Sequence, residues 1–336
     1  MPTCGFHREC VRQYSLQTVN ASAAQWDASN SAAATELHKR HVRAKLACRR
    51  AADMGHVSRH EAHGMKSLTL ESGLQSSGGW CLDVSEQAHD AFSHVKLPKG
   101  GSYFLPKPYL AADSSVVDFL ANLLRHCHDN ACSSWRSLSL NDFGAGIGGY
   151  GRALLDRDAR FKWTGYDAAG NIEEASAGFV HYFDLTTPLS LPRADYVMSL
   201  EVGEHVPPLH EMMVIRNLHA HNCRGIVLSW AAPRKAGVGH VNTHTDAYLR
   251  GIFSQLGYRV NEQRTSMLRE NRTRAAFASA FRGKPIEGPP EIADARRARW
   301  CNKALRWRNV SQAWWWISAL VLERIEPLRG PGCTAE

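Results

Sequence analysis

The sequence predicts an α/β protein built on a doubly wound, mostly parallel sheet with helices on both faces. Residues 138–143 form an apolar run that ends in a cluster of glycines, and a helical pattern follows the glycines. A second short strand over 161–166 then stops on Asp167. A strand, a glycine turn, a helix and a strand that ends on an acid make up the first half of a nucleotide-binding βαβ unit.

The glycine turn over 144–151 is the centre of this prediction. Glycines there let the backbone approach a ligand closely and leave the N–H groups of the next helix pointing at it. The pattern Gly144-Ala145-Gly146-Ile147-Gly148 fits dinucleotide sites as well as the looser pattern of S-adenosylmethionine (SAM) sites. Asp167, at the end of the second strand, can accept hydrogen bonds from both hydroxyls of a ribose.

Asp142, two residues before the first glycine, decides between the two ligands. A dinucleotide must bring its pyrophosphate close to this turn, where a carboxylate would repel it. SAM instead carries an ammonium and a sulfonium group, which a carboxylate attracts. The sign of the ligand's charge therefore favours SAM.

From here the sequence resembles the class I SAM-dependent methyltransferases, and the resemblance continues in order over residues 100–325. Besides the glycine turn and Asp167, it is carried by the adenine-side loop Phe183-Asp184-Leu185, by motif IV at 194–208, by strand five at 224–230 and by a reversed last strand at 314–324. Motif IV reads ADYVMSLEVGEHVPP, which is similar to the LEHVP of small-molecule members.

The resemblance implies a Rossmann-like, doubly wound, seven-stranded sheet whose last strand is reversed, and S-adenosyl-L-methionine as the cofactor. It assigns the cofactor to side chains and backbone at the carboxyl ends of the strands. These are Asp142, Gly144, Ala145, Gly146, Gly148, Tyr150, Asp167, Ala168, Asp184, Leu185 and Glu201.

The other elements follow from periodicity and capping. Residues 113–127 predict an amphipathic helix capped by Asp113 or Ser114, and residues 209–220 predict another. The connection after Asp167 is short for a crossover helix, and within it Asn171 and Glu173 fit a cofactor contact and a helix cap about equally. A helix capped by Thr243 or Thr245 ends at Gly257, and a sixth strand is expected over 258–264.

Candidate catalytic residues lie where strands four and five end. Methyl transfer is an in-line displacement, so positioning supplies most of the rate, whereas an oxygen acceptor also needs a base. His205 occupies the position of the histidine of LEHVP-type relatives, near the transferred methyl, and Glu204 precedes it. His205 is also compatible with a packed histidine bonded to backbone. His240, with Asn242, is a candidate on the acceptor side. A metal on Glu201, His205 and His240 is disfavoured, because the set has only one carboxylate.

These features predict a methyltransferase that acts on an O or N of a small-molecule acceptor. Nucleic-acid base methylation is disfavoured, because the strand tip at 199–203 lacks the Asn/Asp/Ser-Pro-Pro-aromatic pattern. Three alternatives stay open: an NAD(P)-dependent oxidoreductase, a SAM-binding module without catalysis, and an RNA or protein methyltransferase that docks through basic residues.

The charge of the chain is concentrated in one segment. Residues 264–308 contain twelve Lys and Arg and four Asp and Glu, a net charge of +8 (12 − 4), which equals the +8 of the whole chain. A basic insertion over 265–313 between strands six and seven would emerge at the ligand-binding edge of the sheet. It fits a lid for an anionic acceptor and a solvated insertion equally well.

The remaining stretches set the domain boundaries and the expected compartment. Residues 1–70 predict a disordered or transit-like extension, with a single domain over 71–330. Nine scattered cysteines without a CxxC pair indicate a reducing compartment, so a cytoplasmic protein is expected, or an organellar one if residues 1–50 are a transit peptide. The cluster of His126, Cys127, His128 and Cys132 is interpreted as the polar end of a helix. No apolar run is long enough to span a membrane.

Overall fold

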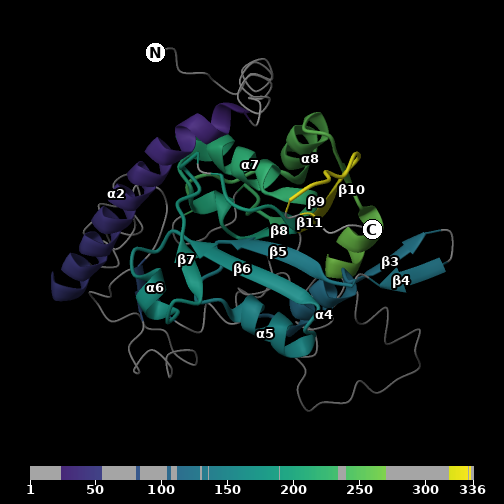
Figure 1. Cartoon of the computed structure of the whole chain (residues 1–336), viewed down its shortest axis with the longest axis horizontal. Helices are drawn as coiled ribbons and strands as arrows, with labels where there is room; N and C mark the ends of the chain where they lie inside the picture. Colours follow the sequence, from purple (N-terminus) through teal and green to yellow (C-terminus); the bar gives the residue numbers. More distant parts are fainter. Residues whose placement is uncertain are drawn as a thin grey trace.

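The computed structural model describes residues 24–54, 81–83, 104–106, 112–128, 131–134, 136–188, 190–233, 240–269, 318–331 and 333. Its centre is a seven-stranded sheet in the order β10-β11-β9-β8-β5-β6-β7 (Figure 1). The strands are β5 (Leu138–Phe143), β6 (Phe161–Asp167), β7 (Val180–Tyr182), β8 (Ala194–Leu200), β9 (Asn222–Ser229), β10 (Tyr258–Val260) and β11 (Leu320–Arg324).

The last strand is reversed. Strand β11 runs antiparallel to both of its neighbours, β9 and β10, whereas β5 is parallel to β6 and β8. The predicted doubly wound sheet with a reversed last strand is therefore confirmed. Strand β5 lies between β6, which follows it in the chain, and β8, which comes later. The chain changes direction across the sheet at this strand, which is where open α/β sheets bind ligands.

Helices cover both faces of the sheet (Figure 1). Helix α4 (Ser114–Asn122), helix α5 (Gly149–Arg157) and a helix over 262–269 pack on one face, and α7 (Glu211–Ala220) and α8 (Asp246–Gln255) pack on the other. Alternate residues of the central strands enter the two cores, as the period of two in a strand requires. In β9, Ile226 and Leu228 face α7 and α8, while Val227 faces α4 and α5.

The boundaries of several elements differ from the sequence expectation. Helix α4 is capped by the Asp113 side chain, as predicted, but it ends at Asn122 rather than at residue 127. Strands β3 (Arg125–His128) and β4 (Ala131–Ser134) follow as an antiparallel hairpin with Cys127 opposite Cys132. The interpretation of this cysteine and histidine cluster as a helix end is wrong. The sixth strand, β10, also stops at Val260, because the helix over 262–269 begins there.

The second crossover is abbreviated, as predicted, since its helix α6 (Ile172–Ala175) has only four residues. Asn171 precedes this helix but makes no side-chain cap. Its amide instead exchanges two hydrogen bonds with the backbone of Leu82, at 2.9 and 2.8 Å, and so fixes β1 (Cys81–Asp83) beside α6. Strand β1 pairs in parallel with β2 (Phe104–Pro106).

A long helix, α2 (Ala24–Met54), lies along the side of the sheet that ends in β7 (Figure 1). The His41 ring stacks on Tyr182 with 4.2 Å between ring centroids, and Lys45 pairs with Glu174 at 2.7 Å. A Cβ added to Gly170 would lie 2.4 Å from backbone atoms of Ala44, so helix and loop touch directly. This helix lies inside the extension over residues 1–70 that was expected to be disordered or transit-like. The other residues of 1–70 lie outside the described residues, so the domain boundary at residue 70 stays a prediction.

Two disulfides join parts of the chain that are far apart in sequence. Cys48 on α2 is bonded to Cys81 on β1, and Cys223 on β9 is bonded to Cys333. The cysteine pattern, which indicated a reducing compartment, gave no expectation of these two bonds. Sequence spacing gave no sign of the pairs, because their members are 33 and 110 positions apart.

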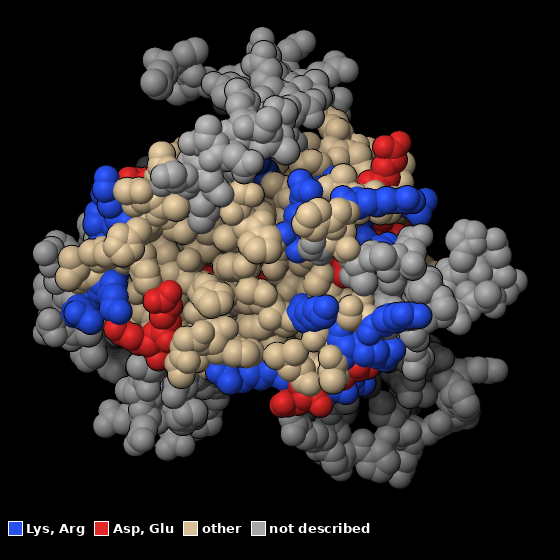
Figure 2. All heavy atoms as spheres, in the orientation of Figure 1, with Lys and Arg blue, Asp and Glu red and all other residues tan. Residues whose placement is uncertain are grey.

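The charged side chains of the described residues are mixed rather than gathered. Figure 2 shows one face with Lys and Arg spread among Asp and Glu around its margin and mostly uncharged side chains at its centre. Most of the basic insertion, residues 270–317, lies outside the described residues, so its role as a lid stays a prediction. Within the part of the chain that the structure describes, no helix has the length and apolarity to cross a membrane.

Candidate active site

The glycine turn between β5 and α5 needs glycine at three positions. Gly144, Gly146 and Gly148 have φ values of 83°, 53° and 83°, in the left-handed region that other residues rarely adopt. Space is also short, because a Cβ on Gly144 would lie 2.2 Å from Cγ2 of Val202. The turn therefore lies directly against the loop that follows β8.

Asp167, at the end of β6, holds this turn in place. Its Oδ2 accepts a hydrogen bond from the Gly146 N–H at 2.9 Å, and its Oδ1 accepts one from the Ala169 N–H at 2.8 Å. Burial raises the pKa of Asp167, and these backbone N–H groups act in the opposite direction. Each carboxylate oxygen can accept more than one hydrogen bond, so the side chain keeps capacity for a ligand. Ala168 stands between the two partners, half-buried.

Asp142 lies beneath the turn and is almost completely buried. The Trp163 indole N–H donates to its Oδ2 at 3.3 Å. Burial, with a smaller contribution from the charge of Asp167, raises the pKa of Asp142 to about 8. Burial, together with the smaller effect of the nearby Asp142 charge, raises the pKa of Tyr150 as well. A buried carboxyl of this kind is neutral until a cation comes near it.

Asp184 and Leu185 follow β7 and are both buried. Asp184 Oδ1 accepts hydrogen bonds from the backbone N–H and the hydroxyl of Thr186, at 2.8 and 2.6 Å. Its Oδ2 accepts from Arg40 of α2 at 3.1 Å. The assignment of this loop to the adenine of a cofactor stays a prediction. If adenine binds there, Arg40 would lie beside it through its contact with Asp184.

Glu201 marks the end of β8. Its φ of 56° is left-handed, which is uncommon for a residue with a side chain and is often found at functional sites. Its backbone N–H donates to the Ser229 hydroxyl at 2.9 Å. The carboxyls of Glu201 and Glu204 are neighbours. Burial raises both pKa values, and the charge of Glu201 raises that of Glu204 further.

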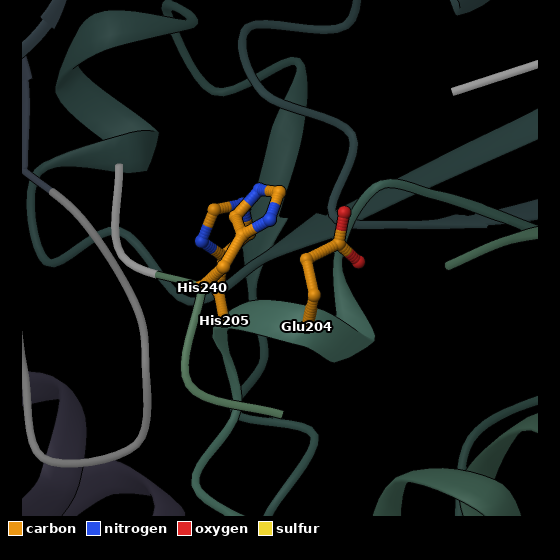
Figure 3. Close-up of side chains that lie close together, drawn as sticks. All are labelled: Glu204, His205 and His240. Atoms are coloured by element: carbon orange, nitrogen blue, oxygen red, sulfur yellow. The ribbon is translucent and has the colours of Figure 1, made fainter. Parts of the chain in front are cut away.

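The three predicted catalytic residues come together. Glu204 and His205 belong to the short helix η4 (Gly203–His205), and His240 comes from the loop after β9 (Figure 3). One ligand-capable atom from each lies within 4.8 Å of the others. The two imidazole rings meet edge to face with 5.0 Å between centroids.

Backbone hydrogen bonds hold the two segments of this cluster together. The N–H groups of Val241 and Asn242 both donate to the Glu204 carbonyl, at 2.8 and 3.0 Å. The Trp230 indole N–H donates to the Asn242 carbonyl at 2.5 Å. Gly203 lies against the Trp230 ring, where a Cβ would come within 2.3 Å of it. Trp230 therefore contacts both the segment of Glu204 and His205 and the segment that follows His240.

Sequence reasoning missed three residues of this site. Trp163 donates to Asp142, Arg40 pairs with Asp184, and Trp230 supports the catalytic cluster. Trp163 and Trp230 do stand in or next to predicted strands, so their positions in the chain offered a weak signal. Arg40 offered none, because a helix of low hydrophobicity gives no reason to expect a contact with a buried acid.

No known protein-family profile matches the sequence, and a search of curated proteins finds no relative. Solved structures that resemble the chain include three methyltransferases. Magnesium protoporphyrin IX methyltransferase from Synechocystis PCC 6803, with bound SAM, has 20% identity and a TM-score of 0.34 over 54% of this chain and 88% of that one. Phosphoethanolamine N-methyltransferase 2 from Haemonchus contortus, in complex with S-adenosyl-L-methionine, has 14% identity and a TM-score of 0.35 over 63% and 52%. The small RNA methyltransferase HEN1 has 16% identity and a TM-score of 0.36 over 44% and 22%. At such values the fold assignment rests on strand order and not on these likenesses.

Proposed function

We propose that the protein is a SAM-dependent methyltransferase that transfers a methyl group to an oxygen or nitrogen of a small-molecule acceptor. The observation that carries this proposal is the pair of acids, the buried Asp142 and the half-buried Asp167, next to a glycine turn at the point where the sheet reverses its strand order. This is the ligand-binding edge of a doubly wound sheet. Two carboxyls there suit a ligand with cationic groups and hydroxyls.

Each part of SAM has a candidate partner at this edge. Asp167 would accept the ribose hydroxyls, and the glycine turn would let the methionine portion approach the backbone. Asp142 would attract the ammonium and sulfonium groups, whose charge would favour the ionised form of this buried acid. Asp184 with Leu185 would lie on the adenine side, and Glu201 beside the methionine.

The reaction is an in-line displacement at the methyl carbon. A lone pair on the acceptor O or N forms the new bond to carbon, the S–C bond breaks with its electron pair staying on sulfur, and the acceptor's proton leaves. The cluster of Glu204, His205 and His240 would stand on the acceptor side, because Val202, two residues before Glu204, contacts Gly144 of the turn. His205 would then be a candidate to receive the proton.

A small acceptor is favoured over a nucleic acid. The described residues present mixed charges on the face in Figure 2, while most of the basic segment over 264–308 lies outside the described residues. The end of β8 also reads Ser199-Leu200-Glu201, without the Pro-Pro-aromatic pattern of base methyltransferases.

Calorimetric titration of the full chain with SAM, S-adenosylhomocysteine and NADH tests the proposal. We expect both sulfur ligands to bind and NADH to show no heat. Asp167→Ala should weaken SAM by roughly 100-fold, because it removes charge-assisted hydrogen bonds worth about 1.5–3 kcal/mol each. Asp156→Ala, an exposed acid on α5, is the matched control and should bind as the parent does. Binding of NADH without SAM would replace the proposal with an oxidoreductase.

Binding alone does not separate an enzyme from a module that has lost catalysis. A screen of small acceptors with SAM labelled in its methyl group, read as transferred label, makes that distinction. Label on a small molecule that disappears with His205→Ala supports catalysis at this cluster. Label transferred only to added RNA or protein would contradict the small-molecule part of the proposal.

A further inference from the structure

The cluster of Glu204, His205 and His240 has the composition of a metal site. Two imidazoles and one carboxylate come from two chain segments, and their ligand atoms lie within 4.8 Å of one another (Figure 3). We propose that these three residues bind one divalent transition-metal ion. From the sequence, a metal on Glu201, His205 and His240 was disfavoured because that set has only one carboxylate, which does not suit the oxygen-binding ions. In the structure, Glu204 joins the two histidines instead.

The donor set selects the kind of ion. Two histidines with one carboxylate are ligands of catalytic Zn²⁺ sites and of non-haem Fe²⁺ sites, whereas Mg²⁺ and Ca²⁺ prefer oxygen alone. Bonds of about 2.0–2.2 Å place ligand atoms of one ion at most about 4.4 Å apart. The observed limit of 4.8 Å is close to this, so small side-chain rotations would complete the site.

Glu204 supplies the independent observation that points to a cation. Its side chain is fully buried, with 0% of the residue exposed, and neither carboxylate oxygen makes a hydrogen bond of good geometry within the described residues. Burying a carboxylate without a partner costs the free energy of its hydration. A bound cation would compensate for that cost.

The framework around the cluster is rigid enough to hold ligands in place. Both segments are joined by the hydrogen bonds from Val241 and Asn242 to the Glu204 carbonyl. The Trp230 indole fixes the Asn242 carbonyl on one side and packs on Gly203 on the other. Preformed backbone contacts of this kind lower the cost of ordering a metal site.

The position of the site suggests a role for the ion in activating the acceptor. This role rests on the proposed function. The loop that carries Glu204 contacts the glycine turn through Val202 and Gly144, so a bound ion would lie on the acceptor side of the cofactor. There it would coordinate an acceptor oxygen and lower the pKa of that hydroxyl, so that its proton would pass to solvent water and His205, as a metal ligand, would not be needed as the base. The acceptors that fit are small molecules whose hydroxyl belongs to a metal-chelating group.

Titration of the full, untagged chain with Co²⁺ after removal of metals by a chelator tests the site. Visible absorption of Co²⁺ reports its ligands directly, without any catalytic readout. We expect one equivalent to bind, and Glu204→Gln and His240→Ala each to weaken binding by at least about 10- to 100-fold. His181→Ala, an exposed histidine on β7, is the matched control and should bind Co²⁺ as the parent does.

Equal Co²⁺ binding by the parent, Glu204→Gln and His240→Ala would overturn the proposal. Thermal melting monitored by circular dichroism checks each variant, and His240→Ala, which lies in a loop and is only half-buried, keeps the test valid if Glu204→Gln does not fold. Titration of the same samples with SAM separates the two proposals. SAM binding without Co²⁺ binding contradicts the metal site alone, and Co²⁺ binding without SAM binding contradicts the proposed function alone.

Discussion

Arg40 on helix α2 donates a hydrogen bond to Asp184 at 3.1 Å, although the two residues are 144 positions apart in the chain. The Asp184 side chain is 3% exposed and that of Arg40 is 33% exposed, so a cation at the margin of the fold compensates a buried carboxylate. Arg40 also donates to the Thr186 hydroxyl at 2.7 Å. This contact attaches α2 to the loop that follows β7.

Arg40→Ala should destabilise the protein by about 1–3 kcal/mol, because it removes a charged partner from a buried acid. Urea unfolding followed by tryptophan fluorescence measures this loss. Arg43→Ala is the matched control, since Arg43 on the same helix is 66% exposed and pairs only with Glu36 among the ion pairs of the described residues. Its effect should stay below about 0.5 kcal/mol. Equal losses in the two variants would mean that the Asp184 contact contributes nothing specific.

Gly170→Ala should destabilise the protein by roughly 1–3 kcal/mol through overpacking. The new Cβ would lie 2.4 Å from backbone atoms of Ala44, and a backbone cannot rotate away as a side chain can. Gly251→Ala is the comparison, because a Cβ on this glycine of α8 meets nothing within 4 Å. That variant should gain about 0.5–1 kcal/mol, the difference between alanine and glycine in a helix. Thermal melting of both variants measures these changes. A change in melting temperature of the same sign in both variants would argue against direct contact between α2 and this loop.

The affinity for SAM should rise with pH through Asp142. Its pKa of about 8 in the free protein means that the carboxyl is protonated at lower pH, while a cationic ligand requires the ionised form. Affinity is therefore expected to increase by up to tenfold per unit between about pH 6 and about pH 7.5, with release of one proton on binding. Calorimetry in two buffers of different ionisation enthalpy counts that proton. Asp142→Asn should bind more weakly and without this dependence; a parent affinity that is flat over the same range would contradict the role of Asp142.

The same shift has the opposite effect on stability. Asp142 holds a proton in the folded state that it loses in the unfolded chain above its ordinary pKa of 3.8. Its contribution to the free energy of unfolding therefore falls as pH rises from about 4 to about 8 and is constant above that. The difference in unfolding free energy between the parent and Asp142→Asn, measured across this range, isolates the contribution.

The Cys48–Cys81 disulfide should stabilise the attachment of α2 and β1. Its members are 33 positions apart, so loss of the bond in a Cys48→Ala, Cys81→Ala double variant should cost about 3–4 kcal/mol through chain entropy. Urea unfolding with and without a reducing agent measures this, with Cys223 and Cys333 retained in every sample. If the reducing agent lowers the free energy of unfolding of the double variant as much as that of the parent, the loss comes from the Cys223–Cys333 disulfide.

Local pattern determined the core of this fold. The glycine turn, the acids at the ends of β5 and β6 and the abbreviated crossover were readable because each depends on neighbours in sequence, whereas the reversed last strand was expected from the resemblance to class I SAM-dependent methyltransferases. A glycine with left-handed φ and an acid at a strand end are set by a few adjacent residues and by the period of the strand. The convergence of Glu204 and His205 on His240 was also expected, since the ends of neighbouring parallel strands meet at one edge of the sheet.

Only the tertiary structure decided the contacts between distant segments. The sequence suggested disorder for residues that form part of α2, because that helix has few large apolar side chains; its order depends on Arg40, His41 and Cys48 meeting partners far along the chain. The cysteine pairs and the Trp230 support of the catalytic cluster arise in the same way. Side-chain partners across more than 30 residues leave no periodicity in a single sequence, because the packing of the sheet and helices brings them together.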